Sequence, residues 1–103
     1  MTTDIETYAS GNWIVKDGSE GEFVQRWTEF LEWTRQAAPG LISASLIRDA
    51  ENPRHFVSFA EWADEGSRKG WQSHADFPAK LGRCRELCDE FVGGSYDLAA
   101  RVA

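Results

Sequence analysis

A chain of 103 residues with five Trp, six Phe and two Tyr is long enough for one domain with a modest core, and its many large rings suit cores, interfaces and ligand pockets. The formal net charge of −6 argues against a nucleic-acid backbone as the main ligand. No apolar run is long enough for a membrane span, and residues 1–12 lack a signal-peptide pattern. We therefore expect a cytoplasmic enzyme or binding module, built as a single domain over residues 1–103.

The first part of the chain predicts a strand followed by a helix. Residues 8–16 are strand-like and end at Asp17-Gly18, a common turn pair. Ser19 and Glu22 have the S-x-x-E spacing of a capping box, which predicts the start of a helix. Apolar residues then recur at helical spacing up to Pro39-Gly40, a strong breaker pair.

A hairpin follows this helix. Residues 41–49 and 55–62 are strand-like, and the link between them contains Asn52-Pro53, which indicates a turn. Residues 64–72 predict only a short and irregular helical start, because two glycines weaken it.

A second long helix is predicted by apolar residues at spacings of 4, 3, 4 and 3, which are Phe77, Leu81, Cys84, Cys88 and Phe91. Gly93-Gly94 is expected to end it, and residues 95–102 then predict a last strand. On such a helix Cys84 and Cys88 would share one stripe. We expect two small buried hydrophobic residues there, and neither a metal site nor a disulfide.

The predicted order β-α-β-β-α-β indicates a ferredoxin-like α+β fold, with one antiparallel sheet and both helices on one face. The strand at 55–62 carries Phe56 and Trp62 on one side, and Val57 and Phe59 on the other. A sheet with one solvated face should alternate more cleanly, so we expect both faces to be covered. A second copy of the chain is the simplest cover, because two-fold homodimers are the commonest oligomers.

The stretch GWQSHADF at residues 70–77 places Trp71 three positions before His74. Pro78 biases the preceding Phe77 away from helical angles, so the main helix is expected to start near Pro78, after one irregular turn. His74 is either a base that titrates near neutral pH or an exposed residue at the start of the helix.

Other candidate residues also have two interpretations. Asn12 lies in a strand-like run and either hydrogen-bonds a ligand carbonyl or oxyanion, or faces solvent at the strand end. Trp62 and Trp71 each either form the wall of a flat pocket or belong to the core. Trp33 lies off the main helical stripe and serves either a dimer interface or a pocket mouth. His55, beside the hairpin turn, is expected to be exposed.

Five stretches of the chain, in this order, resemble the antibiotic-biosynthesis-monooxygenase family: NWIVKDGSEGEFVQRW, PGLISASLIRD, NPRHFVSFAEW, GWQSHADF and YDLAARV. The resemblance covers nearly the whole chain and implies a dimeric α+β barrel, with a pocket between sheet and helices in each subunit. The family includes small cofactor-free monooxygenases that act on polycyclic phenols or quinols, as well as haem-degrading enzymes. Asn12 and Trp71 of this chain match two functional positions of the haem-degrading branch. At the position of that branch's iron-ligating His, this chain has Leu81. Leucine cannot ligate iron, so haem degradation is disfavoured.

The resemblance implies a cofactor-independent monooxygenase that acts on a small polycyclic phenol or quinol-type aromatic. It implies a homodimer with no metal, no other cofactor, and no nucleic-acid or membrane partner. The expected catalytic residues are Asn12, Trp71 and His74, and the expected substrate-binding residues are Trp62, Phe59, Phe77 and Trp27. The alternative is a non-catalytic dimer of the same fold that binds a small apolar ligand.

Overall fold

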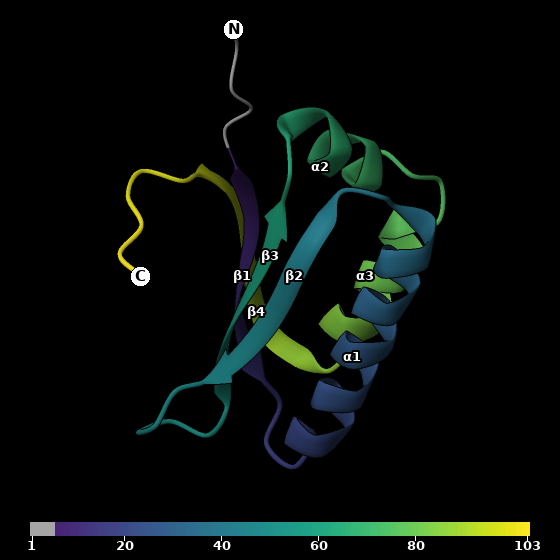
Figure 1. Cartoon of the computed structure of the whole chain (residues 1–103). Helices are drawn as coiled ribbons and strands as arrows, with labels where there is room; N and C mark the ends of the chain where they lie inside the picture. The colour runs from purple at the N-terminus through teal and green to yellow at the C-terminus, as the bar shows by residue number, and fades with distance from the viewer. Residues whose placement is uncertain (1–5) are drawn as a thin grey trace, which may run out of the picture.

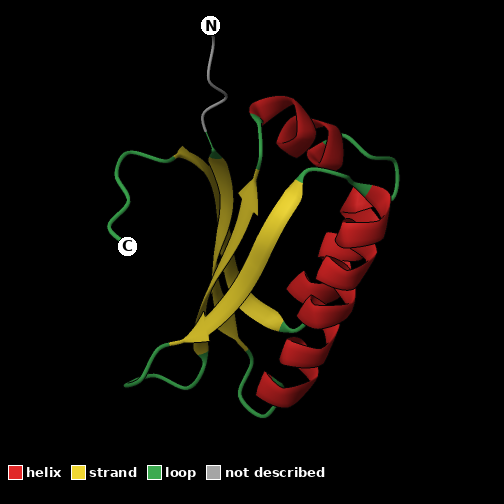
Figure 2. Cartoon of the chain, in the orientation of Figure 1, coloured by secondary structure: helices red, strands yellow, loops and turns green. Residues whose placement is uncertain are grey.

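The computed structural model describes residues 6–103, which form a four-stranded antiparallel sheet with helices packed on one face (Figures 1 and 2). In chain order the elements are β1 (Thr7–Val15), α1 (Glu20–Ala37), β2 (Leu41–Arg48), β3 (His55–Trp62), α2 (Glu65–Gln72), α3 (Phe77–Arg85) and β4 (Cys88–Asp97). The ferredoxin-like α+β prediction is confirmed, with the second helical region divided into α2 and α3. None of the helices in this part of the chain is long and apolar enough to cross a membrane.

The sheet has the order β2-β3-β1-β4, so β1 and β3 are its central strands. β1 pairs with β3 from Thr7↔Trp62 to Ile14↔His55, and with β4 from Thr7↔Asp97 to Val15↔Cys88. All these pairings are antiparallel. The paired strands therefore place residues that are distant in sequence, such as Thr7 and Asp97, directly beside each other.

Helix α1 lies between two turns whose glycines, Gly18 and Gly40, adopt positive φ, a conformation that favours glycine. The boundaries predicted from the breaker pairs are therefore confirmed. The predicted capping box is wrong: the side chain of Ser19 makes no cap hydrogen bond. Glu22 instead pairs with Arg26, one turn further along the helix, at 2.9 Å.

The prediction of a helix from Phe77 to Phe91 and a strand from 95 to 102 is also wrong. Helix α3 ends at Arg85, and β4 runs from Cys88 to Asp97, with Gly93-Gly94 in its interior. The apolar spacing of a helix continues past Arg85, but the backbone from Cys88 onward hydrogen-bonds to β1. Pairing along a central strand outweighs a local helical pattern. Cys84 and Cys88 consequently lie on different elements.

The main core lies between the sheet and the helices, and its buried residues include Trp13, Val15, Phe23, Phe56 and Trp62. The opposite face of the sheet is uncovered. On that face the register aligns Ile47, Val57, Asn12 and Val92 in one row across all four strands. Ile47 is 53 % exposed and Val92 is 69 % exposed, so apolar side chains do lie on both faces, as the strand patterns predicted.

Candidate active site

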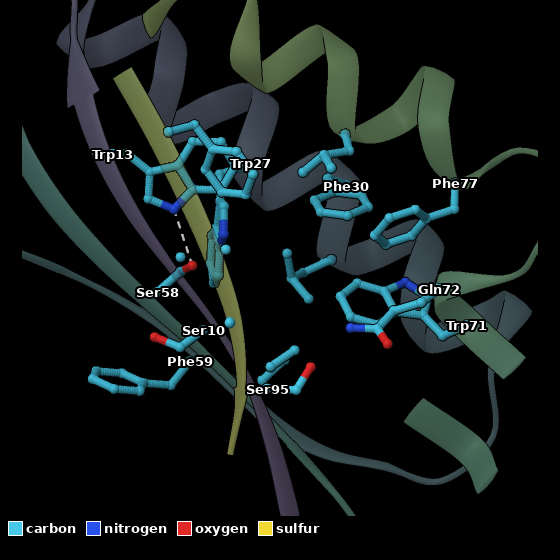
Figure 3. Close-up of a pocket in the computed structure, with 18 residues that line it drawn as sticks. Ser10, Trp13, Trp27, Phe30, Ser58, Phe59, Trp71, Gln72, Phe77 and Ser95 are labelled. Atoms are coloured by element: carbon cyan, nitrogen blue, oxygen red, sulfur yellow. Dashed lines mark hydrogen bonds between the residues drawn. The ribbon is translucent and has the colours of Figure 1, made fainter. Parts of the chain in front are cut away.

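A cavity of about 360 Å³ lies between the sheet and the helices (Figure 3). Most of its wall is aromatic or aliphatic, and the rings that line it include Trp13, Trp27, Phe30, Trp71, Phe77 and Phe91. Its inward-facing polar side chains are Ser58, Gln72 and Ser95, whereas Ser10 borders the cavity with its side chain on the other side of the strands, beside Phe59. This size and composition are typical of sites for small organic ligands.

Glycine in the central strand makes room at one end of this cavity. Gly11 of β1 pairs directly with Gly93 of β4, so neither strand places a side chain there. A Cβ on Gly11 would lie 2.7 Å from Trp13 Nε1 and 2.9 Å from Ser58 Oγ. Those two atoms form a buried hydrogen bond of 3.0 Å, with the Trp13 indole as donor. Gly11 thus permits both the open floor and the hydrogen bond that orients Trp13.

The Trp71 ring is held in one orientation by a hydrogen bond that it donates to helix α1. Its Nε1 donates to Thr34 Oγ1 at 2.9 Å, and the Thr34 hydroxyl donates to the Phe30 carbonyl at 2.8 Å. Phe77 packs edge-on against the Trp71 ring, with the centroids 4.8 Å apart. Because Trp71 is only 6 % exposed, its indole forms a rigid wall of the cavity.

Arg68 of α2 is buried behind the other end of the cavity and is only 7 % exposed. Its Nε donates to Thr7 Oγ1 at 3.0 Å. Its Nη1 donates to two cavity-lining side chains, to Gln72 Oε1 at 3.1 Å and to Ser95 Oγ at 2.9 Å. Figure 3 shows Gln72 and Ser95 away from the Trp13–Ser58 pair.

The four predicted substrate-binding residues do not behave alike. Trp27 and Phe77 line the cavity, as does the predicted catalytic Trp71. Phe59 borders it, but Figure 3 shows its ring on the other side of the strands, and it is 39 % exposed. Trp62 is fully buried behind Trp71, with ring centroids 5.0 Å apart, and does not line the cavity.

Asn12 is exposed on the opposite face of the sheet from the cavity. Its Oδ1 lies 3.0 Å from His55 Nε2, and His55 Nδ1 lies 3.0 Å from Asp49 Oδ2. The hydrogen bond with His55 lowers the pKa of the Asp49 carboxyl. His55 is therefore half-buried in a polar chain with Asp49 and Asn12, where we expected an exposed side chain.

His74 lies in the connection between α2 and α3, also outside the cavity. Its Nδ1 accepts a hydrogen bond from the Asp76 backbone at 3.0 Å. Its ring meets Trp33 edge-on, with centroids 5.1 Å apart. The Trp71–His74 pair is thus divided, since Trp71 faces the cavity and His74 packs against Trp33 on α1.

Several lining residues escaped prediction for identifiable reasons. A glycine within a strand indicates a close approach by another group, and this signal marks Gly11. Gly93 carries the same signal only once β4 is recognised as a strand. Gln72 and Ser95 have no sequence signal, because only the contacts of Arg68 distinguish them from other polar residues.

The cavity wall contains no residue that titrates near neutral pH, among the residues that the structure describes. Within residues 6–103, no group of three or more His, Cys, Asp or Glu is arranged to hold a metal ion. The chemistry that the wall offers is therefore apolar contact, aromatic stacking and hydrogen-bond donation.

Comparison with known proteins places this architecture in a family. The fold is similar to that of SnoaB, a cofactor-independent oxygenase from Streptomyces nogalater, with a TM-score of 0.81, 19 % identity and 96 % of each chain covered. It is also similar to a conserved protein from Methanosarcina mazei Go1, with a TM-score of 0.78, 23 % identity, and coverage of 91 % of this chain and 93 % of that one. A putative antibiotic biosynthesis monooxygenase from Nitrosomonas europaea gives a TM-score of 0.77 at 14 % identity, with 94 % and 93 % covered. No curated protein sequence matches the chain.

The family model for antibiotic biosynthesis monooxygenases matches residues 9–80, which include most of β1, all of α1, β2, β3 and α2, and the start of α3. This match spans well over half of the chain. The protein therefore belongs to the antibiotic biosynthesis monooxygenase family.

Proposed function

We propose that this protein is a cofactor-independent monooxygenase that acts on a small polycyclic phenol or quinol-type aromatic bound in the cavity. The observation that carries the proposal is the aromatic, largely apolar cavity of about 360 Å³ in a chain of the monooxygenase family. The similarity in fold to SnoaB supports it, because that protein is a cofactor-independent oxygenase.

In such a reaction the substrate itself reduces oxygen. With an anthrone, the CH₂ group becomes a carbonyl and receives one atom of O₂. The other oxygen atom leaves as water with the two hydrogens of that carbon, and all four electrons come from the substrate. The protein contributes by binding the flat ring, stabilising its anion and excluding water. Rigid walls such as Trp71, and the apolar side chains Phe77 and Leu81, are suited to these tasks. Asn12 and His74 lie outside the cavity, so the proposal gives neither of them a contact with the ligand.

The test is oxygen consumption with a phenolic anthrone, using protein treated with a chelator and without added flavin, after subtraction of the rate without protein. We expect consumption by the wild type and a loss of at least tenfold in kcat/KM for Trp71→Ala, because that change removes a wall of the cavity. Trp33→Ala is the matched control, since Trp33 is a partly buried Trp that does not line the cavity. Equal kcat/KM for the two variants would contradict the assignment of the site.

A second candidate is a non-catalytic protein that binds a small apolar ligand in the same cavity. The observation that favours it is the absence of a titratable residue from the described cavity wall. It predicts quenching of Trp fluorescence by the aromatic ligand with no oxygen uptake, so both signals should be recorded on the same sample.

We also propose that the chain is a single domain that forms a homodimer through the uncovered face of its sheet. Ile47, Val57 and Val92 lie in one row on that face, with Asn12 between Val57 and Val92, and the exposed Phe59 lies on the same face. Exposed apolar patches of this kind mark interaction sites. Sedimentation at micromolar concentration should give a dimer for the wild type and a monomer for Ile47→Lys. Val24→Lys, at an exposed apolar position on α1, should remain dimeric, and a monomeric wild type would refute the proposal.

A further inference from the structure

We propose that Arg68, through Gln72 and Ser95, makes one end of the cavity a binding site for an oxyanion, so that the ligand is bound as a phenolate or enolate rather than as the neutral phenol. This inference rests on the proposed use of the cavity as the ligand site. It does not depend on whether the bound ligand then reacts with oxygen.

The first step is the charge of Arg68. A guanidinium stays protonated at all ordinary pH values, and this one is 7 % exposed. Among residues 6–103, the carboxylate oxygen that pairs with it is Glu65 Oε1 at 3.7 Å, on a residue whose side chain is 62 % exposed. The same oxygen is 3.0 Å from Lys69 Nζ, so one carboxylate is shared between two cations. A buried cation that is balanced so weakly is costly unless an anion lies close to it.

The second step is the direction of the hydrogen bonds. A guanidinium has only donors, so the Gln72 oxygen and the Ser95 oxygen must both act as acceptors toward Arg68. The Gln72 amide therefore has its oxygen on the side of Arg68, which leaves its NH₂ group free to donate. The Ser95 hydroxyl hydrogen is likewise free to donate. Both side chains line the cavity, and both donors are polarised by the cation behind them.

The third step concerns the proton of the ligand. Because no lining residue of the described wall is a base near neutral pH, the cavity has no side chain that could remove a phenol proton. It favours the anion in another way, by making the ionised form bind more tightly than the neutral one. An oxygen placed between Gln72 and Ser95 would accept from both donors, with the ring packed against Trp71 and Phe77, which is the geometry of a preorganised oxyanion site.

The experiment uses 7-hydroxycoumarin, a flat phenol whose two ionisation states absorb at different wavelengths, and 7-methoxycoumarin, which has the same shape but cannot ionise. The absorbance of the 7-hydroxycoumarin is recorded as the pH is varied, in the presence of enough wild-type protein to bind all of the probe. We expect the phenolate to bind at least tenfold more tightly than the phenol, so the bound probe should ionise at least one pH unit below the free probe. The methoxy compound should bind with the affinity of the neutral phenol.

Variants identify the residues. Ser95→Ala and Gln72→Met should each reduce the preference for the phenolate by about tenfold, because each removes one charge-assisted donor. Both leave Arg68 in place. Arg68→Met should abolish the preference. Ser10→Ala is the control, since the Ser10 side chain lies on the other side of the strands, beside Phe59, and should leave the preference unchanged.

The outcomes are separable. If Arg68→Met does not fold, as judged by circular dichroism, Ser95→Ala and Gln72→Met decide the question. Equal affinity for phenol and phenolate in the wild type, binding of neither form, or an unchanged preference in both of these variants would overturn the inference. A wild type that prefers the phenolate but consumes no oxygen with the anthrone would refute the proposed oxygenase function alone.

Discussion

Substitution of Gly11 by alanine tests the central feature of the cavity floor. The new Cβ would lie 2.7 Å from Trp13 Nε1, 2.9 Å from Ser58 Oγ and 3.0 Å from Phe91 Cε1. Overpacking of this kind costs about 1–3 kcal/mol. If Trp13 or Ser58 moves to relieve the contact, the buried indole N–H loses its acceptor, which costs about 1–3 kcal/mol more. The free energy of unfolding should therefore fall by about 2–6 kcal/mol when both costs apply, a large part of the roughly 5–15 kcal/mol of an ordinary domain.

The assay is urea unfolding followed by Trp fluorescence, at one fixed protein concentration because assembly would change the apparent stability. Gly82→Ala is the matched control. Gly82 lies in the interior of α3, and a Cβ there would meet no atom within 4 Å, so alanine should stabilise the protein by about 0.5–1 kcal/mol. Gly11→Ala should also weaken ligand-induced quenching, because the floor of the cavity is raised. If Gly11→Ala is as stable as the wild type, the inferred packing of Trp13 against β1 and β3 is wrong.

Two further predictions concern other buried groups. Thr34→Val keeps the shape of the side chain but leaves the buried Trp71 N–H without its acceptor, so we expect a loss of about 1–3 kcal/mol in urea unfolding and weaker ligand binding; an unchanged affinity would show that this hydrogen bond does not orient Trp71. Burial raises the pKa of the Cys84 thiol to about 12, whereas an unfolded thiol ionises near pH ~8.5. Above that pH the unfolded thiol has lost its proton while the folded thiol still keeps it, up to a pH of about 12. The free energy of unfolding should therefore fall over this range by about 1.4 kcal/mol per pH unit from this residue. Cys84→Ala should reduce the slope by that amount, and an identical slope in the variant would contradict burial of the thiol.

The sequence predicted α1 and the hairpin strands because each lies between strong local signals. Gly18 and Gly40 supply turns that favour glycine, and periodic apolar residues lie between them. The same local reasoning failed after Arg85. There the apolar spacing of a helix continued across Cys88 and Phe91, while the actual conformation depended on pairing with β1, far away in the sequence.

The site was predictable to a smaller extent. Trp27, Trp71 and Phe77 line the cavity as expected, because large aromatic side chains are found mainly in cores and interfaces. Strand alternation decides the face on which Asn12 lies, and the register of β1 places it opposite the cavity. A shift of one position reverses the face of every side chain in a strand. Because the sequence pattern has apolar residues on both faces, it could not show on which face Asn12 lies.

The amino-acid sequence by itself determined the order of strands and helices in the first two thirds of this protein, the apolar character of both sheet faces, and the family. The first two follow from local propensity and spacing, and the family follows from the resemblance of whole stretches of the sequence to its members. Only the tertiary structure decided that β4 is a strand, that Gly11 lies opposite Gly93, and that Arg68 reaches Gln72 and Ser95. Apart from the Arg68–Gln72 contact within α2, each of these depends on residues that are distant in sequence, and their contacts arise only when the strands pair and the helices pack on the sheet.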